Sequence, residues 1–144
     1  MKEDIIQFGI SKIETKQFAI LEENYNAKVP VELDTNLSFK LDTNEKQVAV
    51  SLTFSFLQKK KAFLKLENVC YFHINDDSWG NIINETNMIL PNNFATHLAI
   101  VSIGTARGVL HSRTTNTLFN KFIVPTINIK ELVPKDVVFN LPKD

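Results

Sequence analysis

Apolar and polar residues alternate with a period of two along three successive segments of the chain. Between Val29 and Leu41 the odd-numbered positions are almost all apolar, and most even-numbered positions are polar. The segment from Val48 to Phe56 alternates in the same way, and the apolar residues between 62 and 74 also share one side. Successive side chains of a strand point to opposite faces, so each segment predicts a strand with one buried face.

Short polar connections separate these predicted strands. Residues 42–45 and 58–61 are rich in charged and polar side chains that favour turns. Three one-sided strands with such connections predict an antiparallel meander. A shorter candidate strand lies upstream at residues 16–22, and residues 24–28 link it to the meander. The sequence therefore predicts four strands.

A long helix is predicted after the strands. It begins at Pro91-Asn92-Asn93, with an asparagine as N-cap, and ends near Arg107, because Gly108 is a natural stop. The helix is apolar on most of its circumference. One stripe is large (Phe94, Leu98, Val101, Thr105), and a second consists of small residues (Ala95, Ala99, Ser102, Ala106). One side would cover the sheet, and the small-residue side would let a helix of another copy approach closely.

These elements predict an α+β fold, in which a four-stranded antiparallel sheet carries one long helix packed on one face. The unpartnered side of the helix predicts a homo-oligomer, a dimer or a tetramer, with residues 94–106 at or near the interface. Residues 75–87 and 112–120 are predicted loops; the sequence assigns no role to Ser112–Asn120. The chain of 144 residues fits one domain, with residues 1–7 and 134–144 as flexible ends.

Composition narrows the classes of function. Apolar residues make up 44% of the chain, and 16 basic residues balance 16 acidic ones. A general nucleic-acid binder needs a basic surplus, so we expect no nucleic-acid partner. No stretch approaches the roughly 20 apolar residues of a membrane-spanning helix, and the first residues do not resemble a signal peptide. We therefore expect a cytoplasmic protein without membrane insertion.

The residues that carry chemistry are scattered. His73, His97 and His111 show no metal-ligand spacing. The single cysteine, Cys70, falls on the apolar face of a predicted strand, which favours a buried structural thiol over a nucleophile. No phosphate-binding or nucleophile motif is present. We expect no metal, no cofactor and no enzymatic activity.

Phenylalanine is abundant, with 11 residues. The alternation predicts that Phe54, Phe56 and Phe72 face the helix. A second group, Phe18, Tyr25 and Phe94, has two interpretations. These residues either converge beside the helix in an apolar channel that binds extended peptide, or they are simply buried within the protomer.

In order and spacing, these elements resemble the family of the bacterial protein-export chaperone SecB. The resemblance spans about residues 8–133. It rests on the segment FGISKIETKQF at 8–18, Leu33-Asp34-Thr35, Ala62-Phe63-Leu64 with Phe72 and Ile74, MILPNNF at 88–94, Arg107-Gly108, and Pro125, Ile127-Asn128-Ile129 and Leu132.

The resemblance implies a dimer of dimers and a long apolar groove that holds unfolded preproteins before they reach the SecA motor. The groove residues would be Phe18, Tyr25, Phe94, Leu98 and Val101. The implied function is a SecB-like chaperone that binds unfolded or extended polypeptides, in protein export. The alternative is a SecB-like interaction module that serves one dedicated partner, such as a toxin–antitoxin chaperone, instead of SecA.

The sequence departs from the family on the outer face of the sheet. Acidic residues that dock SecA in the family correspond here to Gln17, Leu21 and either Lys65 or Leu66, none of them acidic. The acidic residues expected on this candidate partner-docking face are Glu32, Asp34 and Glu67. Docking through charge is weakened when the acids are lost, so we expect weak or no SecA binding. SecA as a partner is left open.

Overall fold

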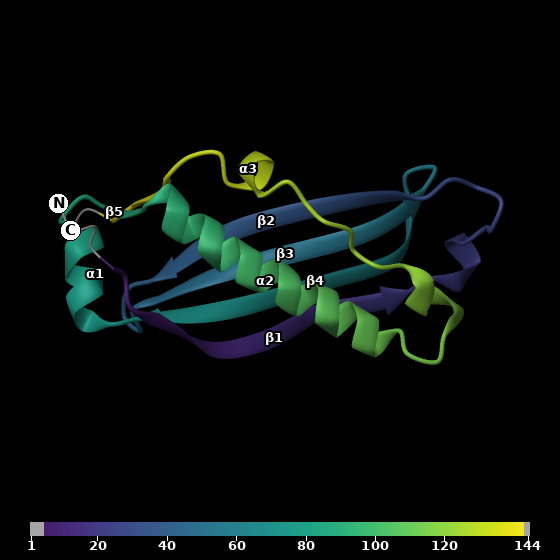
Figure 1. The fold of residues 1–144 in the computed structure, drawn as a ribbon, viewed down its shortest axis with the longest axis horizontal. Helices are drawn as coiled ribbons and strands as arrows, with labels where there is room; N and C mark the ends of the chain where they lie inside the picture. Colours follow the sequence, from purple (N-terminus) through teal and green to yellow (C-terminus); the bar gives the residue numbers. More distant parts are fainter. Residues whose placement is uncertain (1–4, 143–144) are drawn as a thin grey trace.

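The computed structural model describes residues 5–142 and has two layers. One layer is a four-stranded antiparallel sheet with the strand order β1-β4-β3-β2. Its strands are β1 (Phe8–Ile20), β2 (Glu32–Asp42), β3 (Gln47–Gln58) and β4 (Lys61–Ile74). The second layer is dominated by α2 (Asn92–Arg113), which crosses one face of the sheet diagonally (Figure 1). The predicted α+β fold with one long helix on one face is confirmed.

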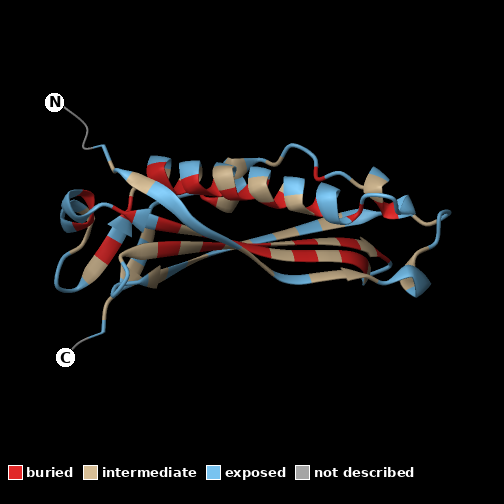
Figure 2. Ribbon diagram, turned by 90° about the horizontal axis from the view of Figure 1, so that it is seen from below, coloured by how far each residue is buried: buried red, intermediate tan, exposed pale blue. Residues whose placement is uncertain are grey.

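The core lies between the helix and the two central strands. β3 and β4 bury alternate side chains on the helix-facing side, and α2 is buried along its sheet-facing side (Figure 2). Phe54 and Phe56 share a core cluster with Ile103 of α2, and Phe72 shares the other cluster with Leu98, so their predicted position under the helix is confirmed. This alternation follows from the period of two in the sequence.

The helix begins and ends differently from the prediction. Its N-cap is Pro91, not an asparagine, and the carboxylate of Asp136 accepts a hydrogen bond from the N–H of Asn92 at 2.7 Å. At the other end α2 continues through Gly108 to Arg113. The extra turn buries Leu110, and burial outweighs the weak helix preference of one glycine.

The small-residue stripe of α2 faces the protein's own sheet and not a second copy. Its members, Ala95, Ala99, Ser102 and Ala106, are fully or almost fully buried. Their small size lets α2 lie close to the large side chains of β3 and β4. The expectation that this stripe accommodates another helix is therefore wrong. The exposed stripe of α2 consists instead of Asn93, His97, Ile100, Gly104, Gly108 and His111.

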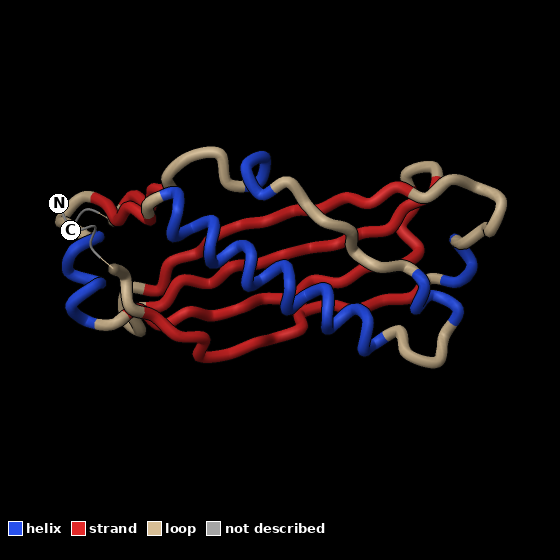
Figure 3. The backbone as a smooth tube through the Cα atoms, viewed as in Figure 1, coloured by secondary structure: helices blue, strands red, loops and turns tan. Residues whose placement is uncertain are grey.

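Several short elements complete the fold (Figure 3). The predicted loop at 75–87 contains the helix α1 (Asp76–Ile82), and the strand β5 (Asn87–Leu90) begins at its end. Trp79 of α1 and Met88 of β5 are buried, which fixes both elements against the core. Residues 137–140 form β6 (Val137–Asn140), which pairs with β5, so the prediction of a flexible end from residue 134 is wrong there. The outer parts of both predicted flexible ends, residues 1–4 and 143–144, lie outside the described residues.

The segment between α2 and β6 runs back along the helix layer. It contains a 3-10 helix at Leu118–Lys121 and the single-turn α3 (Ile129–Leu132). Residues 122–136 are called the tail below. Within residues 5–142, no helix is both long and apolar enough to cross a membrane.

Candidate polypeptide-binding site

An apolar cleft of about 430 Å³ lies between α2 and the tail. Its apolar walls are Ile100 and Ile103 from the helix and Val124, Pro125, Ile127 and Ile129 from the tail. Ile103 and Val124 are buried, but Ile100 is 51% exposed and presents its side chain to solvent. The cleft therefore combines a fixed apolar floor with an accessible apolar rim.

Arg107 fixes one wall of the cleft. Its Nε donates a hydrogen bond to the carbonyl oxygen of Val124 at 2.8 Å, and its terminal Nη2 donates to that of Pro125 at 2.9 Å. These bonds to charged donors tie an irregular segment to the helix. The guanidinium is thereby engaged by the protein's own backbone.

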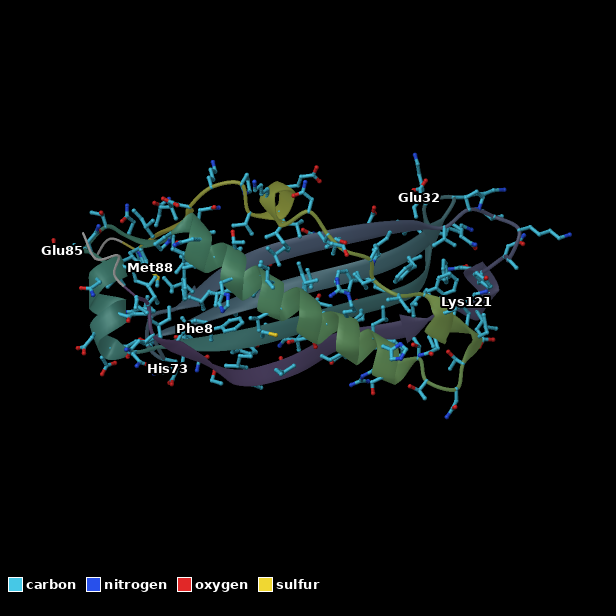
Figure 4. The ribbon with its side chains drawn as sticks, in the orientation of Figure 1. Phe8, Glu32, His73, Glu85, Met88 and Lys121 are labelled. Carbon is cyan, nitrogen blue, oxygen red and sulfur yellow. The ribbon has the colours of Figure 1, made fainter. Side chains whose placement is uncertain are left out.

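The five predicted groove residues do not form one groove. Phe94 and Leu98 are buried in the cluster that contains Phe8 and Phe72, and Val101 packs against it. Phe18 and Tyr25 belong to a second cluster, around Phe63 and Phe119. Figure 4 places Phe8 toward one end of the molecule and Lys121, which follows Phe119 closely in sequence, toward the other. The predicted convergence of Phe18, Tyr25 and Phe94 is wrong, because Phe94 lies at the start of α2, whereas Phe18 lies near Arg113 at its end.

Tyr25 is held inside an aromatic cluster. Its ring lies 5.0 Å from that of Phe63, 5.3 Å from Phe119 and 5.7 Å from Phe122, and the ammonium of Lys121 lies 5.5 Å from the Tyr25 ring centroid. Such edge-on and tilted pairs add stability beyond burial. The link at 24–28 is thus anchored and does not form a free rim.

The side chain of Gln58 anchors the backbone of the same link. Its side-chain oxygen accepts a hydrogen bond from the N–H of Asn26 at 2.8 Å. Its amide nitrogen donates to the carbonyl oxygens of Asn26 at 2.7 Å and Val29 at 3.0 Å. Gln58 itself is buried, so the link and the end of β3 form one fixed unit.

The three predicted docking acids lie on the sheet face opposite α2. Asp34 pairs with Ser55, which in turn pairs with Lys65 of β4. Glu67 pairs with Gln17 and Thr53, and Glu32 begins β2. The acids therefore share a face with lysines and amides, and this face carries charges of both signs. Their role in docking stays a prediction.

Lysines surround one more acid on that face. The carboxylate of Glu14 forms ion pairs with Lys12 and Lys16 on the same strand, the first at 2.9 Å. These partners lower the pKa of Glu14 from its ordinary value of 4.5 to about 2, with Lys16 as the largest cause. Mixed charge of this kind does not produce a uniform negative field.

Cys70 is buried, as predicted. Burial raises the pKa of its thiol, although hydrogen bonds with Ser102 and Thr105 act in the opposite direction. A buried neutral thiol is a poor nucleophile. Among residues 5–142, no group of three or more His, Cys, Asp or Glu side chains could hold a metal ion.

The cleft residues were not assigned to a site from the sequence. A weak signal exists, because Ile100, Ile103 and Arg107 recur at helical spacing on one side of α2. The opposite wall comes from residues 124–129, in a tail that is separated from the helix by a loop and a 3-10 helix. Nothing in the local pattern indicates that Ile127 and Ile129 return to the helix.

Comparison with known proteins finds a likeness in structure and none in sequence. No protein-family model matches the sequence. No curated protein matches it either. The chain is similar in structure to the Rv1957 SecB-like chaperone of Mycobacterium tuberculosis, solved in complex with a ChAD peptide from the Rv1956 HigA1 antitoxin. The TM-score is 0.48 at 9% identity, over 84% of this chain and 91% of that chain.

Proposed function

We propose that this protein is a chaperone that binds unfolded or extended polypeptides, with the cleft between α2 and the tail as its contact site. The observation that supports this proposal is the accessible apolar rim at Ile100 above a floor of isoleucines and valine. The resemblance of the sequence motifs to the SecB family points in the same direction.

The chemistry of the cleft suits a client of low sequence specificity. Apolar side chains of an unfolded segment would gain about 25 cal/mol for each Å² removed from water, before ordering costs. Those costs are large for a disordered ligand, so affinity at one cleft should be modest. Tight holding would then need several clefts on one client, which an oligomer would supply.

A binding module for one dedicated partner is the alternative function. It is favoured by the mixed charge of the outer sheet face, which lacks the acids that the SecB family uses for SecA. A general chaperone suppresses aggregation of unrelated substrates. A dedicated module would suppress none of them and would form a stoichiometric complex with one protein.

Suppression of aggregation tests the proposal. The protein is added to a chemically denatured model enzyme on dilution, and light scattering is followed. Ile127→Asp places a charge in the cleft, whereas Leu118→Asp places the same charge at a site that is 56% exposed and outside the cleft. We expect wild type and Leu118→Asp to suppress aggregation and Ile127→Asp to lose most of this effect. Equal activity of both variants would rule out the cleft, and an inactive wild type would rule out the general chaperone.

A further inference from the structure

The two edges of the sheet differ in regularity. β2 pairs with β3 from Glu32 to Asp42 without any register shift, and it contains no proline. Within the described part of the chain, no backbone hydrogen bond other than those of the β2–β3 ladder involves residues 33–41. Alternate N–H and C=O groups of β2 therefore point away from the sheet, as a template for another strand.

β1, at the opposite edge, carries features that oppose strand addition. Its pairing with β4 is interrupted by two register shifts, between Ile10 and Lys12 and between Thr15 and Gln17. Lys12 and Lys16 also project from this edge strand and pair with Glu14. Bulges and lysines are common means by which proteins protect a sheet edge. β2 is the edge without such bulges.

The tail lies over the space beside β2, on the side of the sheet that carries α2. Figure 1 shows α3 and the segment after it lying beyond β2, outside the sheet. The segment lies on the helix-facing side of the sheet, because residues 132–138 share a cavity with Leu37 and Phe39, whose side chains point to that side of β2. This cavity, between β2 and the segment, has a volume of about 270 Å³. It is lined by Leu37 and Phe39 of β2 and by Leu132, Val133, Pro134 and Val137.

The side chains of β2 suit an added strand on both faces. On the helix-facing side Leu33, Leu37, Phe39 and Leu41 are only half-buried, because α2 packs on β3 and β4. On the other side the strand is polar throughout and begins with the acids Glu32 and Asp34. A partner strand would meet apolar side chains at every second position, except at Thr35, and acidic side chains near one end.

We propose that the β2 edge receives an extended segment of a client polypeptide as a fifth strand, whose alternate apolar side chains enter the cavity under the tail. This inference rests on the proposed function and adds a second contact site for the same client, because the cleft is lined by tail residues 124–129 and the cavity beside β2 by residues 132–138. Backbone hydrogen bonds would hold clients of many sequences, and the cavity would select segments with an apolar residue at every second position. A basic residue facing Glu32 and Asp34 would add charge complementarity.

A second copy of this chain is a poorer occupant of the same edge. Two β2 strands paired about a two-fold axis would keep both helix layers on one side of the joined sheet. Because the tail extends beyond β2, the two tails would meet over the joint and compete for the same space (Figure 1). A client strand brings no such tail.

Disulfide trapping along a model peptide tests the pairing. Cys70→Ala removes the single native cysteine, and Ser38→Cys then places a thiol on the exposed polar face of β2. Ser51→Cys in the same background is the matched control, since Ser51 pairs with Ser38 but lies one strand farther in. A fluorescent 12-residue peptide of alternating valine and threonine carries one cysteine, moved along successive positions, in a glutathione redox buffer.

We expect the Ser38→Cys protein to form a disulfide with the peptide when the peptide cysteine is at every second position, and the disulfide yield at the positions between to be at least fivefold lower. The Ser51→Cys protein should give this lower yield at all peptide positions. A peptide N-methylated along the paired edge should bind at least tenfold more weakly, whereas methylation of the other residues should change affinity little. A peptide that binds by fluorescence anisotropy without this periodicity would overturn strand addition and leave the proposed function standing. Absence of any binding would overturn both, and Ser38→Cys dimers between copies without peptide would assign the edge to a second copy.

Discussion

Asn68 is a buried polar side chain whose replacement should stabilise the protein. It lies on the helix-facing side of β4 between Leu66 and Cys70 and is only 1% exposed. Its side-chain oxygen accepts a hydrogen bond from the hydroxyl of Thr15 at 3.1 Å. Its amide nitrogen has no hydrogen-bond partner. A buried amide group left unpaired costs about 1–3 kcal/mol.

Asn68→Leu removes this unpaired group and keeps the number and branching of the side-chain heavy atoms, although the two methyl groups are larger than the amide oxygen and nitrogen they replace. The hydrogen bond from Thr15 is lost as well, at about 1 kcal/mol, but Thr15 is only half-buried and its hydroxyl can turn to water. We expect a net gain of about 1 kcal/mol in the free energy of unfolding, or roughly 2–5 °C in Tm for a domain of this size. Thr15→Val is the matched control: it leaves both polar ends of Asn68 unpaired and should destabilise the protein by about 1–2 kcal/mol.

Urea unfolding followed by the fluorescence of Trp79, the one tryptophan of the chain and a buried residue, measures both changes. The reasoning requires a higher unfolding midpoint for Asn68→Leu and a lower one for Thr15→Val, with unchanged slopes. A lower midpoint for Asn68→Leu would refute it, because the amide nitrogen would then have to be satisfied in solution.

Four further predictions concern other parts of the molecule. Tyr25→Ala should lower the free energy of unfolding by about 2–4 kcal/mol, since it opens the aromatic cluster; an unchanged urea midpoint would contradict this. Gly104→Glu, on the exposed stripe of α2 but outside the cleft, should convert the expected dimer or tetramer to monomer by light scattering, whereas a wild-type monomer at micromolar concentration would contradict the oligomer. The ion pairs that lower the pKa of Glu14 stabilise the fold fully above about pH 5, and this stabilisation is lost as pH falls toward 2. Glu14→Gln should therefore flatten the acid side of the Tm–pH curve, and an unaltered curve would count against the ion pairs. SecA should bind weakly or not at all in surface plasmon resonance, and a salt-sensitive micromolar complex abolished by alanine at Glu32 and Asp34 would overturn that expectation.

The sheet could be predicted from the sequence because its information is local. One-sided alternation in the segments that became β2, β3 and β4 fixes both the strands and the buried face. The same alternation places Phe54 and Phe72 under the helix. β1 was predicted too short, since its register shifts break the period of two before Lys16.

The elements that the sequence did not predict depend on contacts between distant residues. Gly108 is typical of a helix end, but the helix continues because Leu110 is buried by the sheet and by the 3-10 helix that contains Phe119. β6 exists only because β5 lies beside it, some 50 residues earlier. The path of the tail is set by Arg107, whose hydrogen bonds reach backbone oxygens 17 and 18 residues away.

The same distinction, between local pattern and contacts of distant residues, explains which part of the candidate site could not be predicted from the sequence. The sequence indicates that Leu98 and Ile100 belong to an apolar helix, but not which of them faces the sheet. The diagonal course of α2 decides this: Leu98 is buried and Ile100 is exposed toward the tail. Tyr25 was assigned to a groove rim, because nothing local shows that Phe63 and Phe119 enclose it.

The central claim is that this protein binds unfolded polypeptide. Calorimetric titration with a ligand protein in its folded and unfolded states tests this claim most directly. The ligand is a small disulfide-bonded protein, used in its native form and after reduction and alkylation, which leaves it permanently unfolded with the same composition apart from the blocked thiols. We predict micromolar binding of the unfolded form, with a negative heat-capacity change from buried apolar surface, and no binding of the native form. Equal binding of the two forms, or binding of neither, would contradict the account.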